Sequence, residues 1–435
     1  NIDVNTYIPN RLEEGYGLNK NAIREISYSD TTLIITVDCG ITGIEEIEYA
    51  KEIGIDVIVT DHHEPGEEIP KCIAVIDAKR KDNKYPFNQL AGCGVAFKLM
   101  QALATDWKLP EKEYLKFLDI AAIGTISDIV PLVDENRVIA KLGLMLVERT
   151  NNIGLKTLID LCGFKKIDST TVSFGLSPRI NACGRLGHAD EALELFLANN
   201  RETTKKLAEK MNEYNSARQQ VERKIYEEAV QEIIMEKDKP AIVIGKEGWH
   251  HGVAGIVSSK ITDEYFKPSI LICFDGDEGK GSGRSIPGFD LHEALMECSE
   301  YLEKFGGHSM AVGITIKKDK FENFKKAFIE YTERKDISEI VPVINIERKV
   351  ELKDISIENV KELHQLEPFG EQNKMPLFLI ENLKIVSIRS LSEGKHLKIL
   401  LKQDNFFIDS IGFNMGDLTE QYNCLLYTSP SPRDR

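Results

Sequence analysis

The chain has 435 residues, of which 42% are hydrophobic and 29% charged, with a formal net charge of −15 at pH 7. This composition indicates a globular protein of roughly two to four domains, and because no apolar run is long enough to cross a bilayer we expect no membrane partner. The acidic balance disfavours a nucleic-acid binder, although an acidic protein can carry a basic cleft. Eight cysteines without a CxxC pair argue against a zinc ribbon or a disulfide framework and for the cytoplasm.

Strand and helix patterns alternate in the first part of the chain. Residues 32–37 and 56–60 are strand-like runs, and residues 43–55 between them carry apolar side chains at near-helical spacing. A third apolar run, 72–78, continues the alternation. Strands separated by helical patterns predict a parallel, doubly wound α/β sheet.

Polar residues follow these strands. Asp38 comes directly after the first strand, Asp61, His62 and His63 come directly after the second, and a helical pattern ends just before Asp128. Because open α/β sheets bind ligands at the carboxyl ends of their strands, we expect a site there. Carboxylate and imidazole ligands suit Mn²⁺ or Mg²⁺, and also Zn²⁺, and two metals about 4 Å apart can hold a hydroxide for in-line attack on phosphorus. Taken singly, Asp38 and Asp128 are more typical of helix ends, so the prediction depends on the set.

The rest of the chain changes character twice. Residues 192–235 are charged, helix-favouring and free of Gly and Pro, which predicts a long connecting helix. After residue 240 strand-like runs return and form a second α/β region to about residue 335. From residue 341 short β-like runs dominate, and they suggest a small all-β barrel.

Four further segments offer contacts to phosphate or base. "SPRINACGRLG" (177–187) supplies arginines, which grip phosphate oxygens bidentately, while "GKGSGRSIPG" (279–288) lacks the GxxxxGK[ST] pattern of a P-loop. "FGGHSMAVG" (305–313) has a histidine after two glycines, and "GWHHGVAG" (248–255) has a second histidine pair without an acidic partner, which favours stacking or substrate contact over metal binding. Each segment alone is also compatible with an ordinary loop or turn. The candidate residues are Arg179, Asn181, Arg185, Trp249, His250, Ser282, Arg284, Gly307 and His308.

Several motifs occur together in a fixed order: "YIPNRLEEGYGL" (7–18), "DCG" (38–40), "DHH" (61–63), "GTISDIVPL" (124–132), "RINACGRLG" (179–187), "WHHGVAGI" (249–256), "GSGRS" (281–285), "FGGHSMAVG" (305–313) and "LEPFGEQNKMPLF" (366–378). Over about residues 7–380 this pattern resembles the RecJ family of the DHH phosphoesterase superfamily. The "DHH" motif alone indicates only the superfamily, and the "LEPFGEQN" element with the following β region points to RecJ.

The resemblance implies a fold and an activity. It implies an α/β protein with a parallel-sheet DHH domain (1–191), a long connecting helix (192–237), a smaller DHH-associated α/β domain (238–335) and an OB-like β-barrel (340–424). The implied activity is that of a hydrolase, a phosphodiesterase and exodeoxyribonuclease that releases mononucleotides 5′→3′ from single-stranded DNA with Mn²⁺ or Mg²⁺, in recombination and repair. Single-stranded DNA is the implied partner, together with a single-strand-binding protein and a helicase.

The resemblance also implies roles for individual residues. Asp38 resembles the metal-bridging aspartate, and His62 and Asp128 resemble ligands of one metal. His63 would touch the scissile phosphate or a metal-bound water, and Asp61 joins it as a catalytic residue. The implied contacts to phosphate and DNA are Arg11, Arg179, Asn181, Arg185, Trp249, His250, Ser282, Arg284, Gly307 and His308.

One departure from the family pattern affects the expected activity. RecJ proteins carry a D-x-D-x-D-G segment before the "PNR" motif, and the sequence does not contain it. We therefore expect an amino-terminally truncated fragment whose first strand and helix are missing, whose apolar sheet faces are exposed, and whose two-metal site is incomplete, so that this chain by itself is inactive. We also expect residues 425–435, a Ser/Pro/Arg string, to be a non-native tail.

Three other functions stay open at this point. A DHH phosphodiesterase of short oligonucleotides or cyclic dinucleotides would use the same chemistry, and an inorganic pyrophosphatase would too, but neither is expected to carry the extra β domain. A non-catalytic single-strand-binding fragment would instead show binding that weakens steeply with salt.

Overall fold

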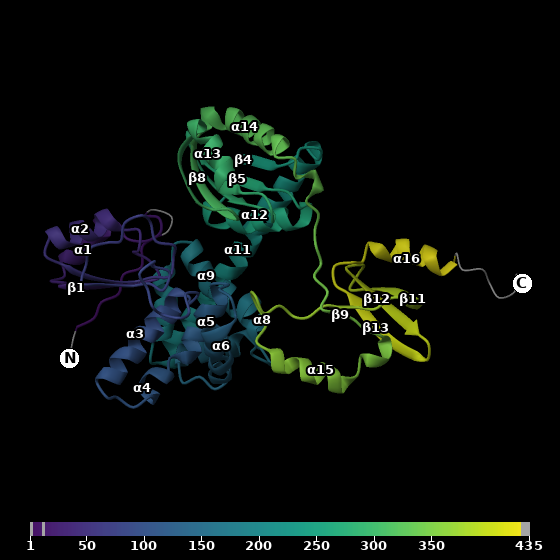
Figure 1. Ribbon diagram of the computed structural model, residues 1–435, viewed down its shortest axis with the longest axis horizontal. Helices are drawn as coiled ribbons and strands as arrows, with labels where there is room; N and C mark the ends of the chain where they lie inside the picture. The colour runs from purple at the N-terminus through teal and green to yellow at the C-terminus, as the bar shows by residue number, and fades with distance from the viewer. Residues whose placement is uncertain (1–2, 11–13, 428–435) are drawn as a thin grey trace, which may run out of the picture. The chain divides into compact units, whose positions relative to one another are not determined.

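The computed structural model describes residues 3–10 and 14–427, and divides into two compact units (Figure 1). The first unit contains Asn1–Pro342 together with Gly370–Gln372, and the second contains Val343–Phe369 and Asn373–Arg435. Among the described residues, no helix is long and apolar enough to span a membrane.

The first unit opens with a small parallel sheet, as the sequence predicts. Its strands lie in the order β1-β2-β3, and both pairs are parallel. One face is covered by α1 and α2, through a core that includes Ile23, Ile47 and Val59. On β1, by contrast, the alternating side chains Leu33 and Val37 are 42% and 53% exposed. The elements are α1 (Lys20–Ser27), β1 (Leu33–Val37), α2 (Ile44–Glu52), β2 (Asp56–Thr60) and β3 (Ala74–Ile76).

Helices make up the rest of this lobe, and one of them corrects an interpretation of the sequence. The segment 177–187 is compatible with a loop by its sequence, but residues Ser177–Arg185 form a helix that continues directly from a π-helical turn. A proline lies in the first turn of this helix, where its missing N–H costs no hydrogen bond. The elements are α3 (Gly92–Asp106), α4 (Lys112–Leu115), α5 (Leu118–Ser127), α6 (Asp134–Val147), α7 (Ile153–Cys162), α8 (Ser169–Thr171), η1 (Val172–Leu176), α9 (Ser177–Arg185) and α10 (Ala189–Leu197).

The long connecting helix is present, but it is shorter than predicted. The helix α11 spans Arg201–Met235, and residues 192–197 of the predicted segment belong to the separate helix α10. The break lies at Asn200, whose extended backbone and side-chain hydrogen bond from the Thr203 amide make it an N-cap. Residues 192–235 contain no Gly or Pro, so the helical pattern is interrupted by an asparagine cap and not by a typical helix breaker.

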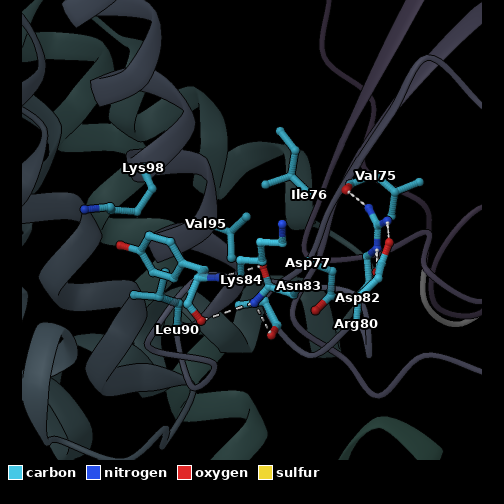
Figure 2. Close-up of a pocket in the computed structure, with 12 residues that line it drawn as sticks. Val75, Ile76, Asp77, Arg80, Asp82, Asn83, Lys84, Leu90, Val95 and Lys98 are labelled. Atoms are coloured by element: carbon cyan, nitrogen blue, oxygen red, sulfur yellow. Dashed lines mark hydrogen bonds and ion pairs between the residues drawn. The ribbon is translucent and has the colours of Figure 1, made fainter.

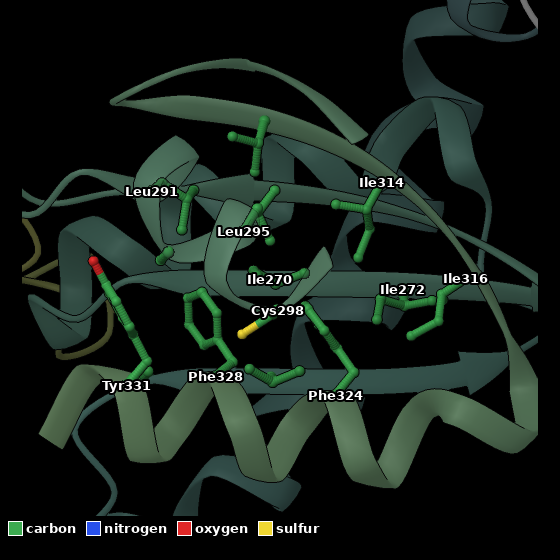
Figure 3. Packing of buried hydrophobic residues seen from close by; sticks show 14 of the residues in the cluster. Ile270, Ile272, Leu291, Leu295, Cys298, Ile314, Ile316, Phe324, Phe328 and Tyr331 are labelled. Carbon is green, nitrogen blue, oxygen red and sulfur yellow. The ribbon is translucent and has the colours of Figure 1, made fainter. Parts of the chain in front are cut away.

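The third part of the first unit is the second α/β region. Its five strands lie in the order β4-β5-β6-β8-β7, with β4 and β5 parallel and the other pairs antiparallel. Figure 3 shows Phe324 and Phe328 pointing from α14 toward Ile270 and Ile272 of the sheet. The elements are β4 (Ile242–Glu247), α12 (His251–Tyr265), β5 (Ser269–Asp275), β6 (Glu278–Arg284), α13 (Leu291–Glu297), η2 (Ser299–Tyr301), β7 (Leu302–His308), β8 (Ala311–Lys317), η3 (Lys318–Lys320), α14 (Phe321–Arg334) and η4 (Ile337–Glu339).

The glycine-rich segment at 279–288 is compatible with a turn by its sequence, but its residues up to Arg284 lie in strand β6. Its alternating glycines lie against large side chains, because an added Cβ at Gly279 would be 2.6 Å from Phe274 and one at Gly281 would be 2.6 Å from Ile314. Glycine is therefore required here by the packing of neighbouring strands and not by a turn.

The second unit contains the predicted small β domain. The strands β11, β12 and β13 form an antiparallel sheet, and β9 and β10 form a separate parallel pair. The last helix runs to residue 427, so the first three residues of the predicted tail are helical, and residues 428–435 lie outside the described part of the chain. The elements are β9 (Arg348–Lys349), η5 (Leu352–Asp354), α15 (Ile357–Leu363), η6 (His364–Leu366), β10 (Phe378–Leu379), β11 (Lys384–Leu391), β12 (His396–Gln403), β13 (Phe406–Gly412) and α16 (Leu418–Tyr427).

Candidate functional site

The three strands of the first sheet end in one row of carboxylates. The residues Val37, Thr60 and Ile76 share a register, so the next residues along the strands are Asp38, Asp61 and Asp77. Backbone hydrogen bonds continue the ladder by one step, from the Asp38 amide to the Thr60 carbonyl and from the Asp61 amide to the Ile76 carbonyl, both 3.0 Å long. The row lies at the carboxyl edge of the sheet, where the sequence placed the site.

Asp38, His62 and Asp128 lie together at this edge. The Nε2 atom of His62 is 3.0 Å from Asp38 Oδ1 and 3.4 Å from Asp128 Oδ2. Asp128 is the C-cap of α5, and its amide donates to the Gly124 carbonyl. Asp38, His62 and His63 each offer a ligand atom, all within 4.8 Å of one another. The structure thus brings together residues that are far apart in the sequence.

This set of residues fits a divalent cation. Asp38 Oδ1 is buried and lies 3.0 Å from His62 Nε2, but this contact does not have the geometry of a hydrogen bond, so a cation or a solvent molecule would stabilise the oxygen. Partial burial, together with the charge of Asp38, raises the pKa of Asp128. A cation between the two carboxylates would remove this repulsion, and mixed oxygen and nitrogen donors suit Mn²⁺, Mg²⁺ or Zn²⁺.

Asp61 orients both histidines. It is 1% exposed, and its Oδ2 accepts a hydrogen bond from the Ile41 amide (2.9 Å). Its Oδ1 accepts from the His62 amide (2.8 Å) and contacts His63 Nδ1 (2.7 Å). Burial opposes ionisation of this carboxyl, but the hydrogen bonds from His63 and from the backbone amides lower its pKa. Asp61 was predicted to be catalytic, but it is too buried to reach a substrate, and we correct its role to that of a positioning residue.

The backbone of Asp38 is strained and tightly enclosed. Its φ of +65° is unusual for a residue other than glycine. An added Cβ at Gly92, the first residue of α3, would lie 2.3 Å from Asp38 Oδ1, so the helix can approach Asp38 only with glycine there. The Tyr16 hydroxyl donates to the Asp38 carbonyl (2.5 Å), and its ring meets the His63 ring edge-on at 5.9 Å.

Three residues at this site were missed by the sequence analysis, namely Tyr16, Asp77 and Gly92. Asp77 is 4% exposed, burial raises its pKa, and its Oδ2 has no hydrogen-bond partner. It follows the third strand as Asp38 follows the first, so the same rule could have found it. Gly92 carries no local signal, because its importance depends on a contact with a residue more than fifty positions away in the sequence.

A cavity of about 340 Å³ lies beside the carboxylate row, between the loop after β3 and α3 (Figure 2). On one wall Lys98 Nζ is 3.2 Å from Glu135, which also accepts a hydrogen bond from the Tyr85 hydroxyl. The cavity shares Asp77 with the row. It is lined by Val75, Ile76, Asp77, Ala78, Arg80, Asp82, Asn83, Lys84, Tyr85, Leu90, Val95 and Lys98.

The candidate phosphate contacts gather at the first turn of α12. Arg185 Nη1 donates to the Gly252 carbonyl (3.1 Å), and His250 Nδ1 accepts from the Gly252 amide (3.2 Å). Arg284 Nη1 donates to Ser282 Oγ (3.1 Å). An added Cβ on Gly255 of α12 would lie 2.9 Å from Ser282 Oγ and 3.3 Å from Arg284 Nη2, so these side chains reach the helix. The start of a helix favours anions, and here it lies beside two arginines.

Other predicted contacts lie elsewhere. Trp249 was predicted to stack on substrate, but it is 6% exposed, packs in a hydrophobic core, and donates through Nε1 to Glu228 (2.9 Å), so the prediction is wrong in this structure. Arg179 donates to Asn212 (3.0 Å) and to the Gly175 carbonyl (2.7 Å), which ties it to α11.

The remaining candidates are less constrained by the structure. Gly307 was predicted to approach a ligand. In the structure its φ is +132° and it lies against the Ala311 backbone, so glycine is required here by the close pairing of β7 and β8. His308 and Asn181 are exposed. Arg11 lies outside the described residues.

Comparison with known proteins covers all three parts of the chain. Residues 1–125 match the DHH family N-terminal domain, residues 238–334 the DHHA1 domain, and residues 346–428 the RecJ OB domain. The chain is 42% identical to the single-stranded-DNA-specific exonuclease RecJ of Bacillus subtilis, over 96% of this chain and 53% of that protein. It is 33% identical to RecJ of Haemophilus influenzae, over 95% of this chain and 76% of that protein. The chain therefore spans about half of the Bacillus subtilis relative.

Solved structures give the same result. A crystal structure of RecJ in complex with Mn²⁺ from Thermus thermophilus superposes with a TM-score of 0.80 at 31% identity, and covers 90% of this chain and 58% of that chain. A crystal structure of RecJ in complex with Mg²⁺ from the same organism has a TM-score of 0.72 at 31% identity, over 89% of this chain and 56% of that chain.

Proposed function

The chain belongs to the RecJ family, and from this premise we propose that it is the catalytic part of a metal-dependent exonuclease that shortens single-stranded DNA from its 5′ end. The named relatives are single-stranded-DNA-specific exonucleases, and solved RecJ structures hold Mn²⁺ or Mg²⁺. These findings support a nuclease with a divalent cation as cofactor. The direction of cleavage and the residue roles are part of the proposal.

The observation that carries the proposal is the convergence of Asp38, His62 and Asp128, with His62 Nε2 lying 3.0 Å from Asp38 Oδ1 and 3.4 Å from Asp128 Oδ2. We assign Asp38, His62 Nε2 and Asp128 as the side chains that would hold a divalent cation. A divalent cation bound there would stabilise charge on the phosphate and lower the pKa of a bound water. Removing any of the three would leave the others as uncompensated groups at the sheet edge.

His63 is the residue that we assign to the reacting phosphate. Its Nδ1 is occupied by Asp61, and its side chain is 47% exposed, so Nε2 is the nitrogen left for a substrate. The hydrogen bond with Asp61 raises the pKa of His63 and favours the protonated ring. A protonated His63 can donate through Nε2 to a phosphate oxygen and stabilise the charge that grows there.

The cluster at α12 is the proposed cradle for the 5′ phosphate. Arg185, Ser282 and Arg284 surround the first turn of a 15-residue helix, with His250 as its N-cap. Arginine side chains and helix amides together bind phosphate oxygens well. A strand held there by its terminal phosphate would be cleaved from the 5′ end, which is the basis for the proposed direction.

The β domain supports a strand longer than a dinucleotide as substrate. Its match to the RecJ OB domain is the reason, because OB folds bind single strands by stacking bases and tracking phosphates. By the same family relation we propose a role in recombination and repair in the cytoplasm, with a single-strand-binding protein and a helicase as partners. These assignments extend the proposal to the whole protein.

The test is digestion of a 5′-phosphorylated, 3′-labelled single strand in Mn²⁺, with the chain alone and with the chain extended by the preceding segment of the Bacillus subtilis relative. In the active form, Asp38→Asn should abolish shortening of the strand. Asp56→Asn is the matched control, because Asp56 is exposed at the opposite end of the same sheet. Inactivity of both forms with salt-sensitive binding would favour a non-catalytic fragment, and preference for dinucleotides would favour a short-oligonucleotide phosphodiesterase.

A further inference from the structure

The segment "LEPFGEQN" (366–373) has no role in the site described so far. Its tip, Gly370–Gln372, clusters with the first compact unit, although the residues on both sides belong to the second. The shape of the segment is held from within, because Asn373 Nδ2 donates to the Leu366 carbonyl (3.0 Å) and to the Pro368 carbonyl (2.7 Å). The tip is therefore a preformed loop whose contacts lie in the first unit.

The tip contacts Leu132 in two ways. The Leu132 amide donates to the Glu371 carbonyl over 2.8 Å. The Gly370 backbone lies so close to the leucine side chain that an added Cβ would be 2.6 Å from Leu132 Cδ1 and 3.0 Å from Cγ. Leu132 is 2% exposed and packs in the helical core with Ile126. The loop tip thus holds both the backbone and the side chain of this leucine.

Leu132 lies four residues after Asp128, and the backbone between them is strained. Ile129 has a φ of +59°, which is unfavourable for a β-branched residue, and its side chain is 72% exposed, so its own packing does not maintain this conformation. The next firm contacts along the chain are at the Pro131 carbonyl, which accepts from Asn136 Nδ2 (3.0 Å), and at Leu132. A strained segment persists only where its surroundings fix it.

We propose that the Gly370–Glu371 tip is a positioning element for Asp128: by fixing Leu132 it holds the strained turn that places this carboxylate beside His62. The inference rests on the proposed function, because it takes Asp128 as a metal ligand. Neither Gly370 nor Glu371 is a catalytic residue, since both act through Leu132.

The experiment compares Gly370→Ala with three other variants of the full chain: Leu132→Ala, the double variant and Gly66→Ala. Leu132→Ala removes the atoms that the new Cβ would strike, so the double variant Gly370→Ala/Leu132→Ala relieves the clash. Gly66→Ala is the control, because a Cβ there meets only the Glu68 carbonyl at 4.0 Å although Gly66 is close in sequence to His63. Amide hydrogen exchange across residues 126–133 and the dissociation constant for Mn²⁺ are measured for each.

In Gly370→Ala we expect faster exchange across 126–133 and Mn²⁺ binding about tenfold weaker, the usual effect of disturbing a residue that supports a ligand. The same substitution should change Mn²⁺ binding much less in the Leu132→Ala background, and Gly66→Ala should change neither quantity. Unchanged exchange or unchanged Mn²⁺ affinity in Gly370→Ala overturns the proposal, and so does an equal loss in both backgrounds. A lowered melting temperature alone would mark a merely structural loop.

The outcomes separate this inference from the proposed function. If Mn²⁺ binding responds as expected but neither the chain nor its extended form cleaves a single strand, the exonuclease proposal fails and the positioning role stands. If the strand is cleaved but Gly370→Ala leaves exchange and Mn²⁺ binding unchanged, only the positioning role fails. If the unsubstituted chain binds no Mn²⁺, Asp128 is not a ligand in this chain and the inference is wrong.

Discussion

The contact between Gly92 and Asp38 leads to a quantitative prediction. In Gly92→Ala the new Cβ would lie 2.3 Å from Asp38 Oδ1, whereas ordinary contact begins at 3.4 Å, so the carboxylate must recede by about 1 Å. Overpacking of this kind costs about 1–3 kcal/mol of folding stability. Because Asp38 is a proposed ligand of the cation, we also expect Mn²⁺ binding to weaken by about tenfold to a hundredfold. Titration of free Mn²⁺ by electron paramagnetic resonance measures the second effect, and urea unfolding measures the first.

The matched control lies two residues further along the same helix. In Gly94→Ala the nearest atoms are those of Leu90 at 3.5 and 3.6 Å, which is ordinary contact, so neither Mn²⁺ binding nor folding should suffer. If Gly92→Ala binds Mn²⁺ as tightly as the unsubstituted chain, the proposed position of Asp38 at the cation is refuted. If both variants lose binding equally, the loss comes from the helix and not from the contact.

Three further predictions concern single side chains. The hydrogen bond with Asp61 raises the pKa of His63 above its unfolded value of 6.5, so the protonated ring stabilises the fold below that pH and the contribution is lost as the pH rises through the folded-state pKa. Because this side chain is 47% exposed, we expect it to contribute at most about 1 kcal/mol to the free energy of unfolding. Urea unfolding of the metal-free chain at several pH values should show this contribution as a dependence of stability on pH, and His63→Gln should abolish it. An unchanged pH dependence in His63→Gln would contradict the prediction. Trp249→Phe should lower the free energy of unfolding by about 1–2 kcal/mol, because the hydrogen bond to Glu228 is lost, and should leave the affinity for single-stranded DNA unchanged. Weaker binding of single-stranded DNA without a loss of stability would instead support a stacking role for Trp249. Asn200→Ala should cost about 1 kcal/mol in thermal unfolding as the cap of α11, and no change would show that the cap is unimportant.

The first sheet and its site edge could be predicted because their signals are local. The runs at 32–37 and 56–60 alternate with a helical pattern, and strands β1 and β2 lie within them. The geometry of a parallel sheet then brings Asp38 and His62 together, as the ion-pair distance of 3.0 Å shows. The same rule would have added Asp77, had it been applied to the third run.

Other features depend on contacts between distant parts of the chain and had no local signal. The glycines of β6 suggest a turn by propensity, but Phe274 and Ile314 occupy the space where their side chains would be. Trp249 looked like a stacking residue because it stands beside two histidines, and only the tertiary structure shows that it is buried. The contact of the loop at 370–372 with Leu132 joins residues more than two hundred positions apart.

The helix α11 affects how the first unit unfolds. Its first half contributes Leu207 and Met211 to one hydrophobic core, and its second half contributes Ile225 and Ile233 to another. Its 35 residues form a rod of about 50 Å in which helix formation is cooperative. Melting of either core would expose half of a helix whose other half is still packed, so the free energies of the two cores are coupled through the peptide backbone. We therefore expect a mutation in one of these cores to lower the stability of the other core as well.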